Sequence, residues 1–438
     1  MRLLHANGAP GEHAPSLYAA RAGEAARVPR PRLERDAEVE TCIVGAGLAG
    51  LSAALHLAEA GREALVLEAH RAGWGASGRN GGQLGSGFNR SPDALAAMIG
   101  AEGARAAWDF AEGAKRLVLE LLSAHGIEAH PRPGIVYAAH RARLVAGLHA
   151  EARRLRDAWG YEAGEILSRE ALLARVASPD YHGGTLDAGA WHLDPLALAL
   201  GLARAAEAAG ARLCERTEAL RIERAPGPAG AWHVVTPRAR VRARRVLVAC
   251  NGYLDDLVPG VGRHVMPINS FVVATEPLGD RLRALLPKDD AVADTRFVID
   301  YFRRSDDGRL VFGGGESYGY RFPGNPARLV RRALVRTFPT LADARVEHAW
   351  GGTLAITRHR LPCVREPRTG LHVMGGWSGH GLALATAGGR AFARAALGDA
   401  AGLRLLESLP APAFPGGTRS RALLQRGAMT GAAWLDRL

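Results

Sequence analysis

Cysteine is scarce in this chain of 438 residues. The four cysteines, Cys42, Cys214, Cys250 and Cys363, lie far apart in the sequence and form no CxxC pair. Disulfide-rich domains and zinc sites need cysteines at short, paired spacings, so the pattern argues against both classes. Two of the four fall within apolar, strand-like runs, and we interpret them as small buried side chains.

Long apolar runs are also missing. The longest, such as Cys42 to Ala58, are interrupted by glycine and are too short to span a membrane. Residues 1–31 contain no continuous apolar stretch of the kind found in signal peptides. We therefore expect no integral membrane segment and a cytoplasmic location. A hydrophobic content of 47% with 23% charged residues excludes a disordered chain.

Lysine occurs only at Lys115 and Lys288, so arginine supplies almost all of the formal net charge of +12. A charge of this size can favour anionic partners such as nucleic acids. The arginines are scattered through helical segments, however, and form no basic arm. Scattered charge is typical of a solvated surface, and we expect no nucleic-acid partner.

What the sequence does contain is a dinucleotide-binding pattern at residues 41–70, "TCIVGAGLAGLSAALHLAEAGREALVLEAH". It predicts a strand, a G-x-G-x-x-G turn at Gly45, Gly47 and Gly50, a helix, and a second strand that ends at Glu68. The first glycine allows the tight turn, the second lets the backbone approach a pyrophosphate, and the third lets the helix pack closely on the strand. The N-terminus of the helix then stabilises phosphate charge.

Glu68 stands where a carboxylate can accept hydrogen bonds from the hydroxyl groups of an adenosine ribose. An acid at this place disfavours the 2′-phosphate of NADP. The residues of this unit therefore leave NAD and FAD as candidate cofactors.

The stretch "GWGASGRNGGQ", residues 73–83, follows Glu68 by only a few residues. Ordered glycine costs backbone entropy, so this many small residues indicate that something approaches the backbone closely. A flavin extends into the protein, so the backbone would have to run flush along it.

Helical spacing predicts helices at residues 91–125, 141–160 and 195–210, and strand-like segments follow at 212–223 and 231–236. The segment "RRVLVACNGY", residues 244–253, predicts a buried strand followed by a turn that contains Asn251. The turn is expected to face the cofactor, and the alternative is that the Asn251 side chain only stabilises the turn. Strand composition and turn signals at three further segments suggest an antiparallel sheet. These segments are residues 267–277, 295–303 and 309–315.

Residues 370–398 again predict a strand, a glycine turn and a helix. The turn carries Gly376, Trp377, Gly379, His380 and Gly381. The helix that begins near Gly381 would point its positive end at the cofactor. We interpret Trp377 as a core residue and His380 as a structural residue rather than a proton carrier.

These segments resemble the D-amino-acid-oxidase-like family of FAD-dependent amine oxidoreductases, and within it the gamma-glutamylputrescine oxidoreductase group. The landmarks appear in the usual order and cover most of the chain: "YAA" near Tyr18, "GAGLAGLSAALHLAEAG", "GWGASGRNGGQ", "ACNGYL", "FVVATEPL", "DYFRRSDDGRLVFGG", "WGGTLAITRHRLP" and "GGWSGHGLALATAGGR". The resemblance implies an FAD site in which six residues line the pyrophosphate and the flavin, with the glycines admitting the flat ring. These are Ser77, Arg79, Asn80, Gly81, Gly82 and Gln83. The resemblance implies that Arg79 helps to neutralise the phosphates, and the alternative for Arg79 is a helix-capping arginine at the surface.

The resemblance also bears on how FAD is held. Monomeric sarcosine oxidases, which resemble this family, bind flavin covalently through a cysteine in the region where this chain has Trp350, Gly351, Gly352 and Thr353. Because no thiol is present there, we expect non-covalent FAD.

The expected fold class is α/β, with an FAD-binding Rossmann-like domain of three layers (ββα) and an interleaved substrate domain built on an antiparallel sheet. We assign residues 36–130, 190–262 and 346–438 to the FAD-binding domain. The substrate domain takes residues 131–189 and 263–345, and residues 1–35 form an N-terminal extension.

The resemblance implies oxidation of the C–N bond of a small-molecule amine to an imine that hydrolyses to an aldehyde or ketone. The amine would be gamma-glutamylputrescine-like or an amino acid, and oxygen or another electron acceptor would reoxidise the flavin. Two other readings stay open. An RNA-associated flavoprotein is favoured only by the net charge, and an NAD-dependent dehydrogenase would share the glycine fingerprint.

Candidates for the substrate face come from the second sheet, which should cover the open side of the flavin. They are Asp300, Tyr301, Arg303, Trp350, His359 and Arg360, of which Tyr301, Arg303, His359 and Arg360 are our catalytic candidates. An arginine there would hold a substrate carboxylate. The alternative for Arg303 and Arg360 is a structural ion pair between domains.

Overall fold

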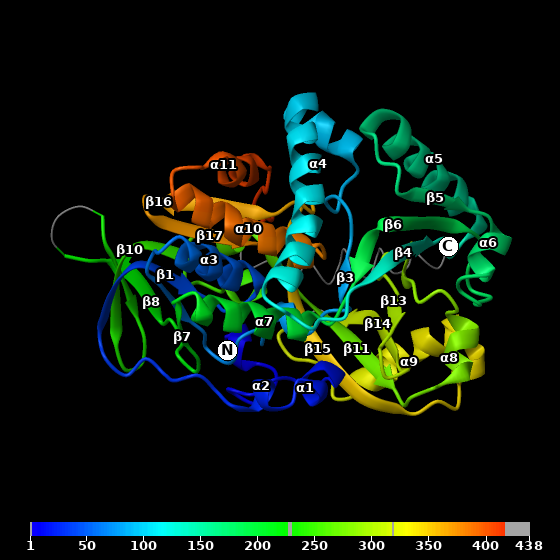
Figure 1. Cartoon of the computed structure of the whole chain (residues 1–438), viewed down its shortest axis with the longest axis horizontal. Helices are drawn as coiled ribbons and strands as arrows, with labels where there is room; N and C mark the ends of the chain where they lie inside the picture. The colour runs from blue at the N-terminus through cyan, green and yellow to red at the C-terminus, as the bar shows by residue number, and fades with distance from the viewer. Residues whose placement is uncertain (1, 227–229, 318, 417–438) are drawn as a thin grey trace.

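Two β-sheets form the framework of the computed structural model, which describes residues 2–226, 230–317 and 319–416 (Figure 1). The first sheet has the strand order β16-β17-β10-β1-β2-β7, and the β8–β9 hairpin joins it at β10. The strands from β17 to β7 run parallel to one another. The bounds are β1 (Ala37–Val44), β2 (Ala64–Leu67), β7 (Arg212–Cys214), β8 (Arg221–Arg224), β9 (Trp232–Val235), β10 (Arg240–Val248), β16 (Cys363–Arg368) and β17 (Leu371–Gly375).

The first sheet is buried on both faces, which explains why its strands read as continuous apolar runs. Ile43 of β1 belongs to a core cluster with α3 (Leu48–Glu59), α7 (Pro195–Ala208) and α10 (Gly381–Ala396). The neighbouring Cys42 packs on the opposite face with residues of β9 and β10. The α/β class that the sequence predicts is confirmed, with helices on one face of a mixed sheet and the β8–β9 hairpin continuing that sheet from β10.

The second sheet has the order β15-β11-β14-β13-β12-β4-β6-β3, with β5 paired to β6. All its pairings are antiparallel except that of β12 with β4. Its strands are β3 (Gln83–Leu84), β4 (Arg132–Ala138), β5 (Gly164–Leu167), β6 (Gly184–His192), β11 (Met266–Thr275), β12 (Ala291–Asp294), β13 (Tyr301–Arg304), β14 (Leu310–Ser317) and β15 (Val346–Ile356).

The remaining helices pack around these sheets (Figure 1). The longest, α4, carries a break at Gly100, where φ is 78°. The helices are α4 (Pro92–Ala124), α5 (Ala142–Trp159), α6 (Arg169–Leu173), α8 (Asp280–Leu285), α9 (Pro326–Thr337) and α11 (Ala401–Ser408). Short 3₁₀ turns occur at η2 (Ala76–Gly78), η3 (Asn251–Tyr253), η4 (Gly262–His264) and η5 (Pro339–Leu341). Within the described ranges, no helix combines the length and the apolar character needed to cross a bilayer.

Two strands, β15 and β3, pair across the predicted domain boundaries. We placed residues 346–438 in the FAD-binding domain, but β15 pairs along its whole length with β11 and therefore belongs to the second sheet. The two-residue strand β3 likewise leaves the first region to pair with β6. Residues 417–438 of that assignment lie outside the described residues, and the rest of the division stays a prediction.

The N-terminal extension contains η1 (Leu3–His5), α1 (Leu17–Arg21) and α2 (Glu24–Arg27) and crosses between the two sheets along the lower edge of the view (Figure 1). Tyr18 of α1 is 1% exposed, and its ring meets that of Trp350 on β15 edge-on, with 5.2 Å between the ring centroids. Its hydroxyl donates to the carbonyl oxygen of Asn80. The extension is therefore packed into the fold at the glycine-rich segment.

Candidate functional site

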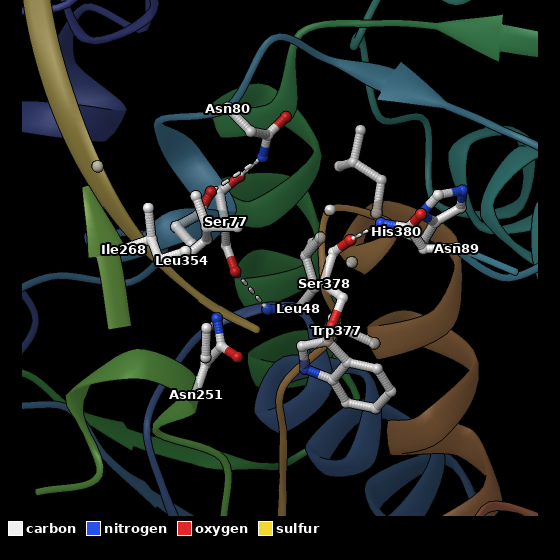
Figure 2. A pocket seen from close by; sticks show the side chains of 18 of the residues that line it. Leu48, Ser77, Asn80, Asn89, Asn251, Ile268, Leu354, Trp377, Ser378 and His380 are labelled. Atoms are coloured by element: carbon white, nitrogen blue, oxygen red, sulfur yellow. Dashed lines mark hydrogen bonds between the residues drawn. The ribbon is translucent and has the colours of Figure 1, made fainter. Parts of the chain in front are cut away.

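A cavity of about 1540 Å³ runs between the two sheets (Figure 2). Its wall joins the C-terminal ends of β1, β2 and β10, the N-termini of α3 and α10, the glycine-rich segment and the inner side of the second sheet. Thirteen of the sixteen predicted cofactor residues line it. They are Gly45, Gly47, Glu68, Ser77, Arg79, Asn80, Gly81, Gln83, Asn251, Trp377, Gly379, His380 and Gly381.

The three other predicted cofactor residues, Gly50, Gly82 and Gly376, stand behind the wall. A Cβ at Gly50 would lie 2.0 Å from the carbonyl oxygen of Gly45, so this glycine lets α3 approach β1, as expected. A Cβ at Gly376 would lie 2.6 Å from Cγ2 of Thr357. These glycines shape the site by allowing backbone packing.

The carboxylate of Glu68 is held at the end of β2 by two backbone N–H groups. Ala46 donates to one oxygen and His70 to the other, both at 2.8 Å. Burial raises the pKa of Glu68 to about 7. Glu68 lines the cavity, and because a carboxylate can accept about four hydrogen bonds, the side chain has capacity left for ribose hydroxyl groups.

Ser77 completes the N-terminus of α3 within the same wall. Its Oγ accepts a hydrogen bond from the N–H of Leu48 at 3.0 Å, as Figure 2 shows. A Cβ at Gly47 would lie 2.9 Å from that oxygen. Any side chain at Gly47 would therefore disturb both the cap of α3 and the cavity.

Arg79 is a buried cation without a carboxylate partner among the described residues. Its Nε donates to the carbonyl oxygen of Trp74 at 2.5 Å, its Nη1 donates to Gly351 at 3.1 Å, and the guanidinium lies 4.2 Å from the Trp74 ring centroid. Its Nη2 is buried and has no hydrogen-bond partner in the part of the chain that the structure describes. Desolvation by burial lowers the pKa of Arg79. An unpaired buried donor is costly unless a ligand satisfies it.

The glycines around Arg79 also make room for close packing within the protein. A Cβ at Gly82, where φ is 81°, would lie 2.0 Å from the carbonyl oxygen of Leu193. Gly81 does line the cavity, but it also makes room for Tyr301, whose ring atoms would lie 2.5 Å from a Cβ at Gly81 and 2.0 Å from one at Gly313. Protein packing therefore explains much of the glycine content.

Asn80 and Asn251 brace two turns of the wall. The Asn80 amide donates to the carbonyl oxygens of Ala76 and Ser77, and its Oδ1 accepts from Gly82. Asn251 adopts a φ of 47°, and its Oδ1 accepts from the N–H of Gly376 at 2.9 Å. Both side chains thus line the cavity while fixing the backbone around it (Figure 2).

The turn before α10 brings the N-terminus of that helix to the cavity (Figure 2). Burial lowers the pKa of His380 to about 4, so the ring is neutral at neutral pH. Trp377 is 6% exposed and belongs to the core cluster, and a Cβ at Gly388 would lie 2.7 Å from its ring. Trp377 thus packs in the core while lining the cavity, and a structural rather than proton-carrying role for the neutral His380 ring stays a prediction.

The four catalytic candidates divide into two pairs. Tyr301 and Arg360 line the cavity. Tyr301 reaches Oγ of Ser270 at 3.5 Å, and burial raises its pKa to about 12, so its hydroxyl stays protonated. Arg360 adopts a left-handed φ of 60°, and its guanidinium has no hydrogen bond or ion pair with a described residue.

Arg303 and His359 lie behind the cavity wall. Arg303 is 6% exposed and donates from Nε to the carbonyl oxygen of Gly81 at 2.9 Å and from Nη2 to the Tyr18 hydroxyl at 3.4 Å. Through these contacts, Arg303 supports the glycine-rich segment from behind. His359 offers its carbonyl oxygen to Nε of Arg90, and its Nδ1 is buried without a partner. Trp350 is also structural, since its Nε1 donates to the carbonyl oxygen of Arg79.

Sequence reasoning missed a polar cluster at the cavity wall, in which Ser86, Tyr161 and Asp187 line the cavity and the buried Lys115 lies behind them. The Lys115 ammonium donates to Ser86 at 2.5 Å and to Tyr161 at 3.2 Å, and Ser86 donates to Asp187 at 2.5 Å. Tyr161 also donates to Asp187. The four residues come from separate parts of the chain and share no motif, so only the fold brings them together.

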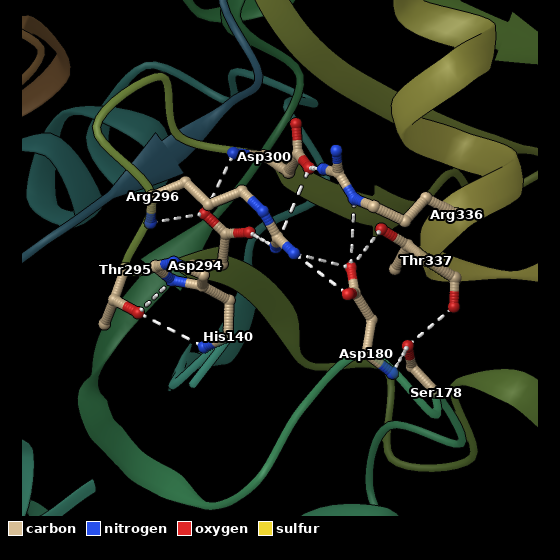
Figure 3. Close-up of polar contacts among 9 residues, drawn as sticks. All are labelled: His140, Ser178, Asp180, Asp294, Thr295, Arg296, Asp300, Arg336 and Thr337. Carbon is tan, nitrogen blue, oxygen red and sulfur yellow. Dashed lines mark hydrogen bonds and ion pairs between the residues drawn. The ribbon is translucent and has the colours of Figure 1, made fainter. Parts of the chain in front are cut away.

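The connection between β12 and β13 forms another part of the wall. We predicted a strand over residues 295–303, but β13 begins at Tyr301, and Phe297, Val298 and Ile299 line the cavity from a loop. Arg296 binds Asp294, Asp180 and Asp300, and Arg336 binds Asp180 and Asp300 (Figure 3). This ion cluster fixes both ends of the loop. Asp300, a candidate for the substrate face, therefore anchors the loop.

The ion cluster contains three carboxylates and two guanidinium groups, so one carboxylate is in excess. Burial, with Asp294 nearby, raises the pKa of Asp300 from 3.8 to about 7. A group with a raised folded-state pKa contributes stability that is fully present below about pH 3.8 and is lost as the pH rises through about 7. A shift of this size corresponds to at most about 4 kcal/mol.

We therefore expect Asp300→Asn to flatten the pH dependence of stability. Thermal unfolding midpoints, measured from pH 5 to pH 8.5, should fall more steeply for the wild-type protein than for the variant. The exposed Asp306, replaced by asparagine, serves as the control and should follow the wild-type curve. Parallel curves for Asp300→Asn and wild type would contradict this assignment of the titrating group.

Comparison with known proteins gives a consistent result. The family model described as FAD dependent oxidoreductase matches residues 40–395. The chain is 41% identical to the probable oxidoreductase OrdL of Rhizobium meliloti, covering 93% of this chain and 94% of that protein. It is 37% identical to gamma-glutamylputrescine oxidoreductase of Escherichia coli, covering 94% and 95%.

Among solved structures, glycine oxidase from Geobacillus kaustophilus has the same fold. The TM-score is 0.68 at 21% sequence identity, and the match covers 87% of this chain and 97% of that one. The residues of the cavity fit FAD: Glu68 has free acceptor capacity for a ribose, Arg79 has an unused buried donor, and two helix N-termini face the cavity.

Proposed function

The chain belongs to the family of FAD-dependent oxidoreductases, and on that premise we propose that it oxidises the C–N bond of an amine that carries a carboxylate. The proposed substrate is gamma-glutamylputrescine-like or an amino acid. The observation that supports it most directly is the guanidinium of Arg360 in the cavity wall. It makes no hydrogen bond or salt bridge with a described residue, although the charge of Glu316 acts on it, and a guanidinium can bind a carboxylate through two parallel hydrogen bonds. The E. coli relative named for gamma-glutamylputrescine points the same way.

Bound FAD supplies the redox chemistry by accepting a hydride from the carbon next to the substrate nitrogen. The residues of the chain must hold the amine neutral, because a protonated amine has no free electron pair with which to form an imine. The guanidinium groups of Arg79 and Arg360 line the cavity and disfavour an ammonium group near them. The nearby charge of Glu316 acts on Arg360 and offsets part of this effect.

Other residues limit water and position the substrate. Phe297, Val298 and Ile299 present apolar side chains at the cavity, and the Tyr301 hydroxyl stays protonated as a hydrogen-bond donor. After oxidation, water would add to the imine and release an aldehyde or ketone. Oxygen or another electron acceptor would then complete the cycle.

The test is an anaerobic titration that follows flavin absorbance with gamma-glutamylputrescine, sarcosine, glycine and D-alanine, and with 2-hydroxy acids for comparison. We expect at least one amine to reduce the flavin, at a rate that rises with pH as the amine loses its proton. If 2-hydroxy acids reduce the flavin and no amine does, the proposal is wrong.

Arg360→Met should raise the substrate concentration needed for half-reduction by about tenfold to a hundredfold while FAD stays bound, since a charge-assisted hydrogen-bond pair is lost. Arg358→Met is the matched control, because Arg358 is exposed and donates to the carbonyl oxygen of Ala413. Equal titrations for Arg360→Met and wild type would place the carboxylate elsewhere.

We also propose that FAD is bound without a covalent link, because Gly351 and Gly352 occupy the region where a cysteine would be needed. Acid precipitation should leave the yellow flavin in the supernatant. Flavin that stays with the precipitated protein would overturn this point and leave the amine assignment untouched.

A further inference from the structure

Residues 2–13, which we call the N-terminal strap, precede the part of the chain that the family model matches, residues 40–395. They nevertheless form part of the cavity. Arg2 and Leu4 line it, and Leu3 is 1% exposed. The strap therefore adds a wall to the site that the family pattern does not account for.

Ion pairs and hydrogen bonds hold the strap near Glu68, the residue that fits the ribose of FAD. Arg2 and His5 contact the Glu218 carboxylate at 2.7 and 3.1 Å. The N–H of Leu3 donates to Asp255 at 3.1 Å. Glu218 and Asp255 both line the cavity, so the strap closes over the same end of it.

His70 connects the strap to Glu68 directly. Its backbone N–H donates to the Glu68 carboxylate, while its ring meets the carbonyl oxygen of Leu4 through Nε2 at 3.1 Å and the N–H of Gly11 through Nδ1 at 3.0 Å. Because a backbone N–H can only donate, Nδ1 must accept and Nε2 must carry the proton. The ring also stacks on Trp74, with the centroids 3.8 Å apart.

The middle of the strap reaches the other half of the molecule. The Asn7 amide donates to the carbonyl oxygen of Tyr320 at 2.6 Å, and its Oδ1 accepts from the N–H of Phe322 at 2.7 Å. Both partners lie between β14 and α9 of the second sheet region. The strap thus spans the cavity from the dinucleotide side to the substrate side and is bonded at both.

We propose that the N-terminal strap is a binding element for FAD that closes the adenosine end of the cofactor site and slows FAD release. Arg2 and Leu4 line this end of the cavity, so FAD release at this end would require the hydrogen bonds at His70 and Asn7 to open. This role concerns retention of the cofactor, and it holds whether or not the substrate is an amine.

The experiment measures the rate at which free FAD fluorescence appears after the holoenzyme is diluted. Deletion of residues 2–13 should speed FAD release by about tenfold. In the full chain, His70→Phe should have an effect of about the same size, because it removes the two hydrogen bonds from the ring to the strap and keeps an aromatic ring stacked on Trp74. Asn7→Ala should speed release from the other side. Arg2→Ala is compared with Arg238→Ala, because both arginines are about half exposed and contact a glutamate at 2.7 Å.

Only Arg2→Ala should release FAD faster than wild type in that matched pair. If the deletion variant does not fold, His70→Phe and Asn7→Ala decide the matter in the intact chain. Folded variants that release FAD at the wild-type rate would overturn the proposal and leave the strap as surface packing. Flavin reduction by amines is measured separately, so either result can stand without the other.

Discussion

Replacing Arg79 with methionine is expected to leave a folded protein that has lost most of its FAD. The guanidinium is 5% exposed, donates to two backbone carbonyl oxygens and has no carboxylate partner among the described residues. Its Nη2 is buried and unused. Charge-assisted hydrogen bonds to a phosphate would satisfy that donor, and in a low-dielectric cavity their loss should weaken FAD binding by about a hundredfold or more.

The measurement is the dissociation constant of FAD, together with the unfolding midpoint in the presence and absence of FAD. If FAD alone offsets the cost of burying the Arg79 guanidinium, Arg79→Met should lower the stability of the FAD-bound form much more than that of the apoprotein. Arg90→Met is the control, because Arg90 also lines the cavity but is exposed and bonded to the carbonyl oxygen of His359. Equal losses in both forms would show that Arg79 acts only as a structural residue.

The parts of this site that the sequence could predict are local. The strand, glycine turn and helix around Gly45, Gly47 and Gly50 depend on residues close in the chain, and the spacing to Glu68 follows from one helix and one strand. The same holds for the turn before α10. At these places, backbone geometry dictates the residue type, so the residue type reveals the geometry.

What the sequence could not predict depends on contacts between distant segments. Gly81 and Gly313 are both glycine because the Tyr301 ring lies against each of them. Arg303 and Arg360 were both candidates for binding a substrate carboxylate. Arg303 donates to the carbonyl oxygen of Gly81, whereas Arg360 lines the cavity. Which of the two arginines lines the cavity depends on how the strands of the second sheet pair, and that pairing cannot be read from the local sequence.

The second large effect is expected at Gly389, in the middle of α10. A Cβ there would lie 2.2 Å from the carbonyl oxygen of Ala49 and 2.8 Å from the N–H nitrogen of Ala53, both in α3. Backbone atoms cannot rotate away, so Gly389→Ala must push α10 off α3. Both helices direct their N-termini at the cavity, and we expect the variant to lose about 3 kcal/mol of stability and to bind FAD more weakly.

Gly147→Ala provides the matched control, because Gly147 also lies inside a helix, α5, and a Cβ there would meet nothing within 4 Å. Alanine favours a helix over glycine by about 1 kcal/mol, so this variant should be slightly more stable than wild type and should bind FAD unchanged. Since the helix propensity gain is common to both substitutions, the difference between their urea midpoints isolates the contact between α10 and α3. Two variants with the same midpoint and the same FAD affinity would mean that the helices can separate without disturbing the site.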